Sequence, residues 1–346
     1  MSQMKIQDAI AQVLDRRDLS QQQMQAVMSQ IMTGSCSDAQ IGGFLIGLRM
    51  KGESIDEITA AASVMSSLAD EVNVEADNLI DIVGTGGDGT STFNVSTAAT
   101  FVAAGAGASV AKHGNRSVSS KSGSADLLEQ AGANLNLNSQ QVAEVIKQAG
   151  VGFMFAPMHH SAMRHAIGPR KDMAVRTIFN VLGPLTNPAG VKRQVVGVFA
   201  RELTETLANV FAQLGSEHTL VVHSDDGMDE ISICAPCTVS EYRDGAVRTY
   251  TICPEDFGLK TASLDSLVVP DSEASLKIIE QVLNGKTGPA RDIVVLNAGA
   301  GIYVSGIANS LANGIELAAQ AIDSGKALAA KQAYIKATQS VGDAGK

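Results

Sequence analysis

The sequence predicts an α/β protein with two parts: a small all-helical subdomain, then a larger α/β subdomain with a central, mostly parallel sheet. Residues 1–70 carry helical patterns and no strand signal. From Leu79 onward, short apolar runs alternate with helical segments, which is typical of a parallel sheet. A length of 346 residues allows about two domains with a sizeable core. We expect the following division: 1–71 as the helical subdomain, with a helical insertion at about 162–183 packing on it, and 79–156 with 191–346 as the α/β subdomain.

Four helices are expected in the first 70 residues. Three of them begin with a capping-box pattern, a serine followed three residues later by glutamine or glutamate. These pairs are Ser20 with Gln23, Ser37 with Gln40, and Ser54 with Glu57. Gly34 and Gly52 are suited to ending the helices that precede them.

The third of these helices contains three glycines, Gly42, Gly43 and Gly47. Each costs up to ~1 kcal/mol relative to alanine inside a helix, so a close approach of another backbone is expected there. We favour a homodimer contact through the helical subdomain. Tight packing inside the subdomain is the alternative.

The α/β part has a regular succession of elements. A helix is expected over Asp172–Leu182, and Asp244-Gly245 between two strand-like runs indicates a hairpin turn. Short branched apolar runs predict strands at Leu79–Val83, Ala108–Ala111, Val151–Ala156, Gln194–Ala200, His218–His223 and Ile293–Leu296.

Two turns after strands are suited to binding anions. The first is the glycine-rich Gly84–Gly89 before a helix, and the second is Lys112–Arg116 followed by the Ser/Gly segment Ser117–Ser124. Glycine lets main-chain N–H groups point inward, and a helix start adds free N–H groups and a positive dipole end. Neither the P-loop nor the dinucleotide spacing is present. Two such turns suggest a ligand with more than one phosphate, and a plain tight turn is the alternative for the first.

Charged residues gather in two further stretches. The acidic segment Asp225–Glu230 follows an expected strand, where carboxylates face the usual ligand crevice and suit Mg²⁺. A solvated acidic turn is the alternative. The basic residues Arg164, His165, Arg170 and Lys171 could include a partner for a substrate carboxylate, or could form a surface helix.

Composition narrows the class of protein. A net charge of -10 argues against a general nucleic-acid binder. No apolar run approaches the ~20 residues of a membrane span, and the first residues do not resemble a signal peptide, so we expect a cytoplasmic protein without membrane partners. Cys234 and Cys237 have metal-site or redox spacing, but no second pair is present. Reduced, structural thiols are the favoured interpretation.

Six ordered motifs together resemble the anthranilate phosphoribosyltransferase family, and the resemblance covers nearly the whole chain. The motifs are Gly84-Thr85-Gly86-Gly87-Asp88, Asn94-Val95-Ser96-Thr97, Lys112–Arg116 with Ser119–Asp126, Arg164-His165-Ala166 with Pro169-Arg170, Phe179–Pro188, and Asp229-Glu230. The family implies a helical subdomain beside an α/β subdomain, usually dimerising through the helices. It also implies a role in tryptophan biosynthesis.

The resemblance assigns roles to residues. Those implied to bind 5-phosphoribosyl 1-pyrophosphate and anthranilate are Gly84, Gly87, Asp88, Thr92, Asn94, Val95, Ser96, Thr97, Lys112, His113, Gly114, Asn115, Arg116, Ser117, Val118, Ser119, Ser120, Ser124 and Arg170. Asn115 and Arg170 would meet anthranilate. Ser96, Asp229 and Glu230 would hold two Mg²⁺ ions. No residue is expected to act as a catalytic acid, base or nucleophile.

The implied reaction fits these roles. Pyrophosphate leaves C1 of the ribose, positive charge develops on the sugar, and the amine of anthranilate attacks. That amine is unprotonated near neutral pH, so positioning and electrostatics should dominate. A pyrimidine nucleoside phosphorylase-like enzyme and a non-catalytic nucleic-acid-binding relative are the two alternatives.

Overall fold

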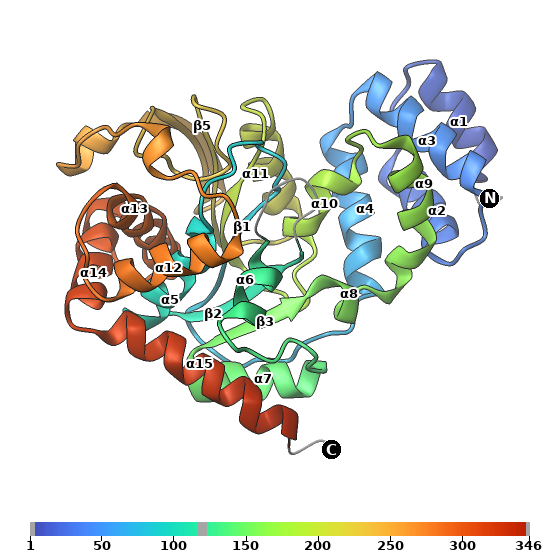
Figure 1. The fold of residues 1–346 in the computed structure, drawn as a ribbon. Helices are drawn as coiled ribbons and strands as arrows, with labels where there is room; N and C mark the ends of the chain where they lie inside the picture. The colour runs from blue at the N-terminus through green and yellow to red at the C-terminus, as the bar shows by residue number, and fades with distance from the viewer. Residues whose placement is uncertain (1–3, 117–122, 344–346) are drawn as a thin grey trace.

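The computed structural model describes residues 4–116 and 123–343, and its centre is a seven-stranded sheet (Figure 1). The strand order is β3-β2-β1-β4-β5-β6-β7. Neighbours from β3 to β5 are parallel, and β6 and β7 extend the sheet antiparallel. The strands are β1 (Leu79–Gly84), β2 (Ser109–Gly114), β3 (Val151–Phe155), β4 (Arg193–Gly197), β5 (His218–Ser224), β6 (Cys237–Arg243) and β7 (Ala246–Ile252). The order reverses between β1 and β4, where an open α/β sheet has its ligand crevice.

The helical subdomain lies to one side of the sheet, at the right of Figure 1. It contains α1 (Ile6–Leu14), α2 (Gln21–Met32), α3 (Asp38–Lys51) and α4 (Ile55–Ser67). The expected capping boxes are confirmed at the starts of α2, α3 and α4. Gly52 ends α3 with a φ of 91°, and Gly34 follows α2 with a φ of 75°.

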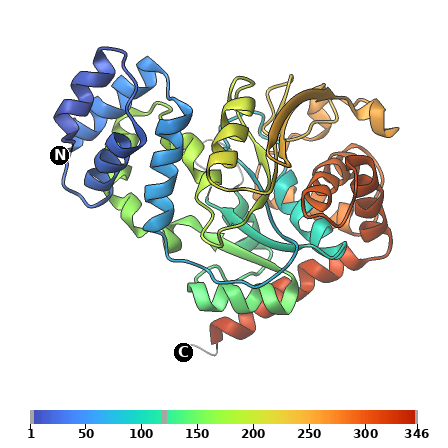
Figure 2. The same cartoon turned by 180° about the vertical axis from the view of Figure 1, so that it is seen from behind.

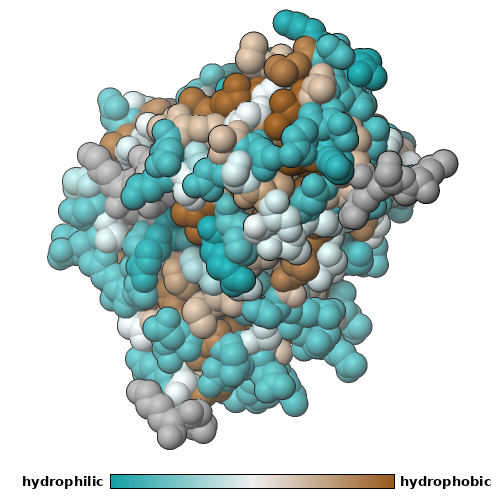
Figure 3. All heavy atoms as spheres, turned by 90° about the vertical axis from the view of Figure 1, so that its right-hand side faces the viewer, coloured by the Kyte–Doolittle hydropathy of each residue, from teal (hydrophilic) through white to brown (hydrophobic). Residues whose placement is uncertain are grey.

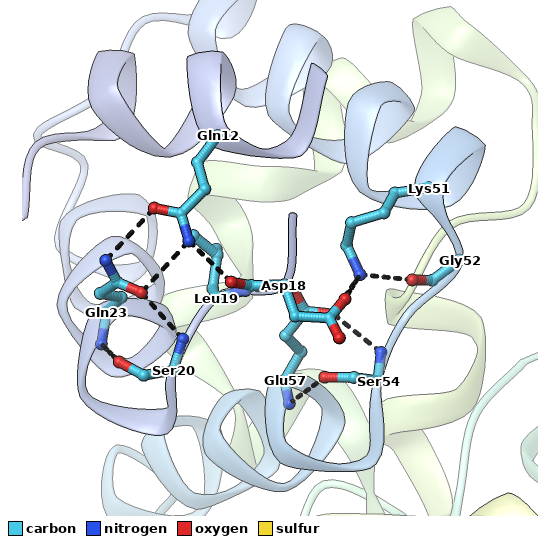
Figure 4. Close-up of polar contacts among 9 residues, drawn as sticks. All are labelled: Gln12, Asp18, Leu19, Ser20, Gln23, Lys51, Gly52, Ser54 and Glu57. Carbon is cyan, nitrogen blue, oxygen red and sulfur yellow. Dashed lines mark hydrogen bonds and ion pairs between the residues drawn. The ribbon is translucent and has the colours of Figure 1, made fainter. Parts of the chain in front are cut away.

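A buried glutamate joins three of these helices (Figure 4). Glu57 at the start of α4 is fully buried, and its carboxylate accepts from the N–H groups of Leu19 and Ser54, each at 2.8 Å. Lys51 at the end of α3 donates to the same carboxylate at 2.8 Å and also contacts Asp18. Each buried charge therefore has partners, as burial in a low-dielectric core requires.

The insertion packs on the helical subdomain. After α8 (Ala156–His159), it contains α9 (Arg164–Met173), which packs against α2 and α3, and α10 (Phe179–Leu185), which packs against α4. A Cβ on Gly42 of α3 would meet Met173 Sδ at 3.6 Å, and one on Gly47 would meet Val13 Cγ2 at 2.8 Å. Packing inside the chain thus accounts for Gly47, whereas a side chain on Gly42 would make an ordinary contact and Gly43 is exposed.

The remaining helices cover the two faces of the sheet. They are α5 (Val95–Gly105), α6 (Ser124–Gln130), α7 (Ser139–Ala149), α11 (Leu203–Gln213), α12 (Ser272–Leu283), α13 (Pro289–Val304), α14 (Leu311–Asp323) and α15 (Lys326–Asp343). Helices α5 and α13 pack on one face, while α11 packs on the other and against α4 (Figures 1 and 2). Adjacent strand residues alternate between the two cores: Val195 joins the first and Val196 the second. Within the described residues, no helix is long and apolar enough to cross a membrane.

Two expectations about elements were wrong. Ile293–Leu296 is not a strand but part of α13. A short apolar run has the same sequence pattern in a fully buried strand and in a fully buried helix. The helix expected over Asp172–Leu182 is broken: α9 ends at Met173, and Ala174 takes a left-handed φ of 51° before α10 begins. Burial around α13 and the local backbone at Ala174 are not visible in a pattern of residue types.

Candidate active site

Loops from three parallel strands meet at the carboxyl edge of the sheet. A Cβ on Gly84, at the end of β1, would lie 2.3 Å from Asp229 Oδ2. A Cβ on Gly197, at the end of β4, would lie 1.4 Å from the Asp229 backbone oxygen. Asp229 belongs to the loop after β5, so this loop reaches across the ends of β4 and β1. Only glycine leaves room for it at these two positions.

The glycine-rich loop after β1 has the backbone that its sequence predicts. Gly86, Gly87 and Gly89 have φ values of 67°, 79° and 77°, in the left-handed region. The Gly86 N–H donates to Asp229 Oδ2 at 2.7 Å. The loop after β1 is thereby fixed to the loop after β5.

Three carboxylates converge beside this loop. Ligand oxygens of Asp88, Asp229 and Glu230 lie within 4.8 Å of one another. Burial and the neighbouring Asp88 raise the pKa of Asp229 to about 6. Burial and the two other carboxylates raise the pKa of Glu230 well above its ordinary value. The cluster concentrates negative charge that the described chain only partly neutralises.

The nearest cation is Lys112, which is buried on β2. Its Nζ donates to the Ile82 carbonyl and, at 3.3 Å, to Ser96 Oγ at the start of α5. Burial lowers the pKa of Lys112, while Asp81, Glu230 and Asp229 oppose that shift. Lys112 therefore lies close enough to Asp229 and Glu230 to interact with their charges.

The Asn94-Val95-Ser96-Thr97 segment opens α5. The Asn94 side chain caps the helix by accepting from the Thr97 N–H at 3.3 Å. Val95 is buried in the core, so only its backbone can face a ligand. Thr92 forms an isolated antiparallel bridge with Val268.

The second anion loop is described only at its ends. Gly114 ends β2 and Asn115 is exposed. Arg116 forms ion pairs with Asp126 (2.9 Å) and Glu129 (2.6 Å) of α6. Ser124 begins α6, while the expected ligands Ser117, Val118, Ser119 and Ser120 lie outside the described residues.

This chain matches two parts of one family. Residues 7–69 match the glycosyl transferase family, helical bundle domain, and residues 76–328 match the glycosyl transferase family, a/b domain. The anthranilate phosphoribosyltransferase of Thioalkalivibrio sulfidiphilus is 58% identical over 337 residues, covering 97% of this chain and 100% of that protein. The chain belongs to the anthranilate phosphoribosyltransferase family. It is therefore an enzyme of the glycosyltransferase class.

Solved structures of this family agree with the fold. The Thermus thermophilus anthranilate phosphoribosyltransferase has a TM-score of 0.91 at 40% identity, covering 96% of this chain and 99% of that one. The Saccharomyces cerevisiae enzyme, in complex with PRPP and Mg, has a TM-score of 0.88 at 29% identity, covering 97% and 98%. The same yeast enzyme was also solved with 4-fluoroanthranilate. These relatives do not favour the phosphorylase or nucleic-acid-binding alternatives.

The acidic cluster has the kind of ligands that would suit Mg, with which the yeast enzyme was solved. Among the described residues it is the one group of three or more metal-ligating side chains, and all its ligands are oxygens, which Mg²⁺ prefers. Burial and mutual repulsion raise the pKa of Asp229 and of Glu230 even though Lys112 lies close to Glu230, so a bound cation would stabilise their charged forms. Sequence analysis placed Asp88 with the substrate ligands and missed it as a member of this cluster. Its position in the glycine-rich loop after β1, between Gly87 and Gly89, was the available signal.

The basic residues of the insertion belong to α9, which packs against α2 and α3 of the helical subdomain. Arg170 of α9 has its guanidinium 5.1 Å from the Phe179 ring centroid, and burial lowers its pKa. His113, from β2, lies against His160 with ring centroids 5.0 Å apart and contacts the Gly183 carbonyl at 3.2 Å. Burial lowers the pKa of His113 to about 3 and that of His160 to about 4, so both are neutral.

Two buried polar residues behind the site were also missed. Asp81 of β1 is fully buried, accepts from Asn187 Nδ2 at 2.8 Å, and has a pKa raised to about 6 by burial. Asn187 also donates to the Ala111 carbonyl at 2.9 Å, so it connects the segment after α10 to β1 and β2.

Cys234 and Cys237 both have free thiols; Cys237 begins β6 and is buried. Neither belongs to the metal-ligating group found among the described residues.

Proposed function

We propose that this enzyme transfers the phosphoribosyl group from 5-phosphoribosyl 1-pyrophosphate (PRPP) to the amine of anthranilate. The products are N-(5-phosphoribosyl)anthranilate and pyrophosphate, in tryptophan biosynthesis. The observation that carries this proposal is the crevice where a glycine-rich loop, Lys112 and the Asp88–Asp229–Glu230 cluster converge at the strand ends. Such a crevice suits a sugar that carries a phosphate and a pyrophosphate.

The acidic side of the crevice has the ligands for Mg²⁺. We assign Ser96, Asp229 and Glu230 to two ions, with Asp88 beside them within 4.8 Å of both acids. The metal would supply charge neutralisation for the pyrophosphate. Asp229 is buried, and electrostatic interactions are stronger where burial lowers the local dielectric.

Backbone and lysine donors would stabilise the leaving group. Lys112 has a fixed position, since the Ile82 carbonyl and Ser96 Oγ both hold its ammonium. Backbone N–H groups of the glycine loop and the positive dipole end of α5 add partial positive charge without any side chain having to move. The second loop, from Lys112 to Ser120 and Ser124, would hold the remaining phosphate and the ribose.

The helical side of the crevice would receive anthranilate. Arg170 would pair with its carboxylate, and Asn115 would contact its ring substituents. The amine of anthranilate is an aromatic amine that is unprotonated near neutral pH, so its lone pair is available for attack on C1. Attack needs orientation rather than a strong base.

We also propose that the enzyme is a homodimer through the helical subdomain, meaning 1–71 with the insertion at 162–183. Leu14 of α1, Met50 of α3 and Ile167 of α9 are 66%, 70% and 55% exposed. Figure 3 shows this end of the molecule, with apolar atoms gathered between hydrophilic ones. Large exposed apolar side chains on packed neighbouring helices are suited to contact between copies. Light scattering on the wild type and on Met50→Asp tests this, and a monomeric wild type contradicts it.

The reaction can be followed by the fluorescence of anthranilate. Loss of anthranilate should require both PRPP and Mg²⁺, and pyrophosphate should appear in equal amount. A phosphate-dependent release of free base from a pyrimidine nucleoside, with no consumption of anthranilate, would refute the assignment.

A further inference from the structure

A single arginine of the helical insertion reaches across the crevice to the glycine-rich loop. Arg176 lies between α9 and α10, in a segment that the family motifs above do not include. Its neighbour Thr177 is buried and donates its N–H to Asn180 Oδ1 at 2.9 Å. Ile178 belongs to the buried core that the helical subdomain shares with α11. The backbone of Arg176 is therefore anchored on the helical side of the crevice.

The side chain of Arg176 contacts two loops of the α/β subdomain. Its Nη2 donates to the Gly87 carbonyl, and its guanidinium lies 4.2 Å from the centroid of the Phe199 ring. Phe199 follows β4, and its N–H donates to Thr85 Oγ1 at 3.2 Å. One guanidinium thus binds the loop after β1 directly and stacks on the loop after β4.

The contact with the Gly87 carbonyl sets the direction of the next amide. The carbonyl of Gly87 and the N–H of Asp88 belong to one planar trans peptide and point in opposite directions. Within residues 4–116 and 123–343, the Asp88 N–H has no hydrogen-bond acceptor, although its peptide is held in place. With its carbonyl held by Arg176, this peptide presents its free N–H on the side away from the guanidinium. Gly87, at a φ of 79°, has no side chain to fix this arrangement itself.

We infer that Arg176 is a positioning residue for the pyrophosphorylated substrate, acting through the Gly87–Asp88 peptide. This inference rests on the function proposed above. Arg176 holds the peptide so that the Asp88 N–H is preset as an anion donor and the Asp88 carboxylate stays with Asp229 and Glu230. Because the backbone of Arg176 is anchored in the insertion, the conformation of the glycine-rich loop after β1 also depends on the position of the insertion.

The contact should affect PRPP more than anthranilate. Without the charge-assisted hydrogen bond from Arg176, the Gly87–Asp88 peptide is no longer held in place for PRPP. We expect the affinity for PRPP to fall about tenfold as a result. Arg176 is exposed, so its removal should leave the melting temperature nearly unchanged. A lysine can still donate to the Gly87 carbonyl, but its ammonium is not planar and cannot stack on the Phe199 ring. Arg176→Lys should therefore recover part of the lost PRPP affinity.

The test is calorimetric titration of PRPP in the presence of Mg²⁺, for wild type, Arg176→Ala, Arg176→Lys and the control Arg248→Ala. Arg248 is exposed on the edge strand β7, and its loss removes the same charge far from the crevice. We expect Arg176→Ala to bind PRPP about tenfold more weakly, Arg176→Lys to be intermediate, and the control to match wild type. In steady-state assays the KM for PRPP should rise while the KM for anthranilate stays the same.

The outcomes separate this inference from the proposed function. PRPP affinity of Arg176→Ala within twofold of wild type overturns the inference, and so does an equal rise in both KM values with a lowered melting temperature. A wild type that binds PRPP but does not consume anthranilate overturns the proposed acceptor instead. The calorimetric comparison still decides the role of Arg176 in that case.

Discussion

Replacing Gly197 with alanine should inactivate the enzyme by displacing the loop that holds the acidic cluster. The added Cβ would lie 1.4 Å from the Asp229 backbone oxygen and 2.3 Å from its carbonyl carbon. To reach even 3.0 Å from that oxygen, the two segments must separate by about 1.6 Å. The obstacle is backbone, so no side-chain rotation can relieve it.

The expected magnitude follows from that displacement. A misplacement of ~1 Å in a catalytic constellation can cost about 10²-fold in rate, so we expect kcat/KM for PRPP to fall by roughly 10²-fold or more. Overpacking that the backbone can accommodate costs about 1–3 kcal/mol of unfolding free energy. The loss of the Gly86 N–H bond to Asp229 contributes to both effects.

The assay compares Gly197→Ala with Gly168→Ala. Gly168 is in α9, and a Cβ there meets nothing within 4 Å, so alanine should be neutral or stabilise by up to ~1 kcal/mol. Anthranilate fluorescence gives the rate, and urea unfolding gives the stability. If Gly197→Ala keeps wild-type kcat/KM, the close approach of the two strand-end loops does not position the site.

Three further predictions concern single side chains. Asp229→Asn and Glu230→Gln should each require far more Mg²⁺ for half-maximal rate, because each removes one anionic oxygen ligand; an unchanged Mg²⁺ titration would exclude the metal role. Arg170→Ala should raise the KM for anthranilate about 10- to 100-fold, since a charge-assisted bond is worth ~1.5–3 kcal/mol; an unaltered KM would count against that contact. Because burial lowers the pKa of His113 and His160 to about 3 and 4, the unfolded chain binds protons that the folded chain does not once the pH falls below about 6.5. Stability should therefore fall as the pH drops from 6.5 to 4, by up to about 1 kcal/mol per pH unit per histidine, and His160→Gln should flatten the slope of unfolding free energy against pH.

Local signals in the sequence were enough for most elements. The capping boxes depend on residues three positions apart, and all three formed. The hairpin at Asp244-Gly245 was predicted from two residues, which take φ values of 51° and 79° between β6 and β7. The strand at Ile293–Leu296 failed because its apolar residues are buried on every side of α13, which erases the helical period.

Long-range relations were less accessible. Asp88 and Glu230 are distant in the chain, and their approach depends on β1 and β5 flanking β4, an order that no local pattern specifies. Arg176 was missed for a similar reason, because its partner is a backbone carbonyl that any residue could supply. The motifs indicate which loops follow the parallel strands, but not which atoms in those loops meet.

The acidic cluster is the point where function and stability oppose each other. The pKa of Asp229 is raised from its ordinary 3.8 to about 6, so above pH 6 the folded chain carries a buried charge that the unfolded chain carries in water. A group with this shift has no effect on stability at low pH, where it is protonated in both states; its unfavourable effect grows as the pH rises from about 4 to 6 and then stays constant. Near neutral pH the fold therefore retains a strained group of like charges, which Gly84 and Gly197 allow by admitting Asp229 so closely. A cation that binds these carboxylates relieves their mutual repulsion. The repulsion that lowers the free energy of unfolding therefore strengthens the binding of the metal and its pyrophosphate.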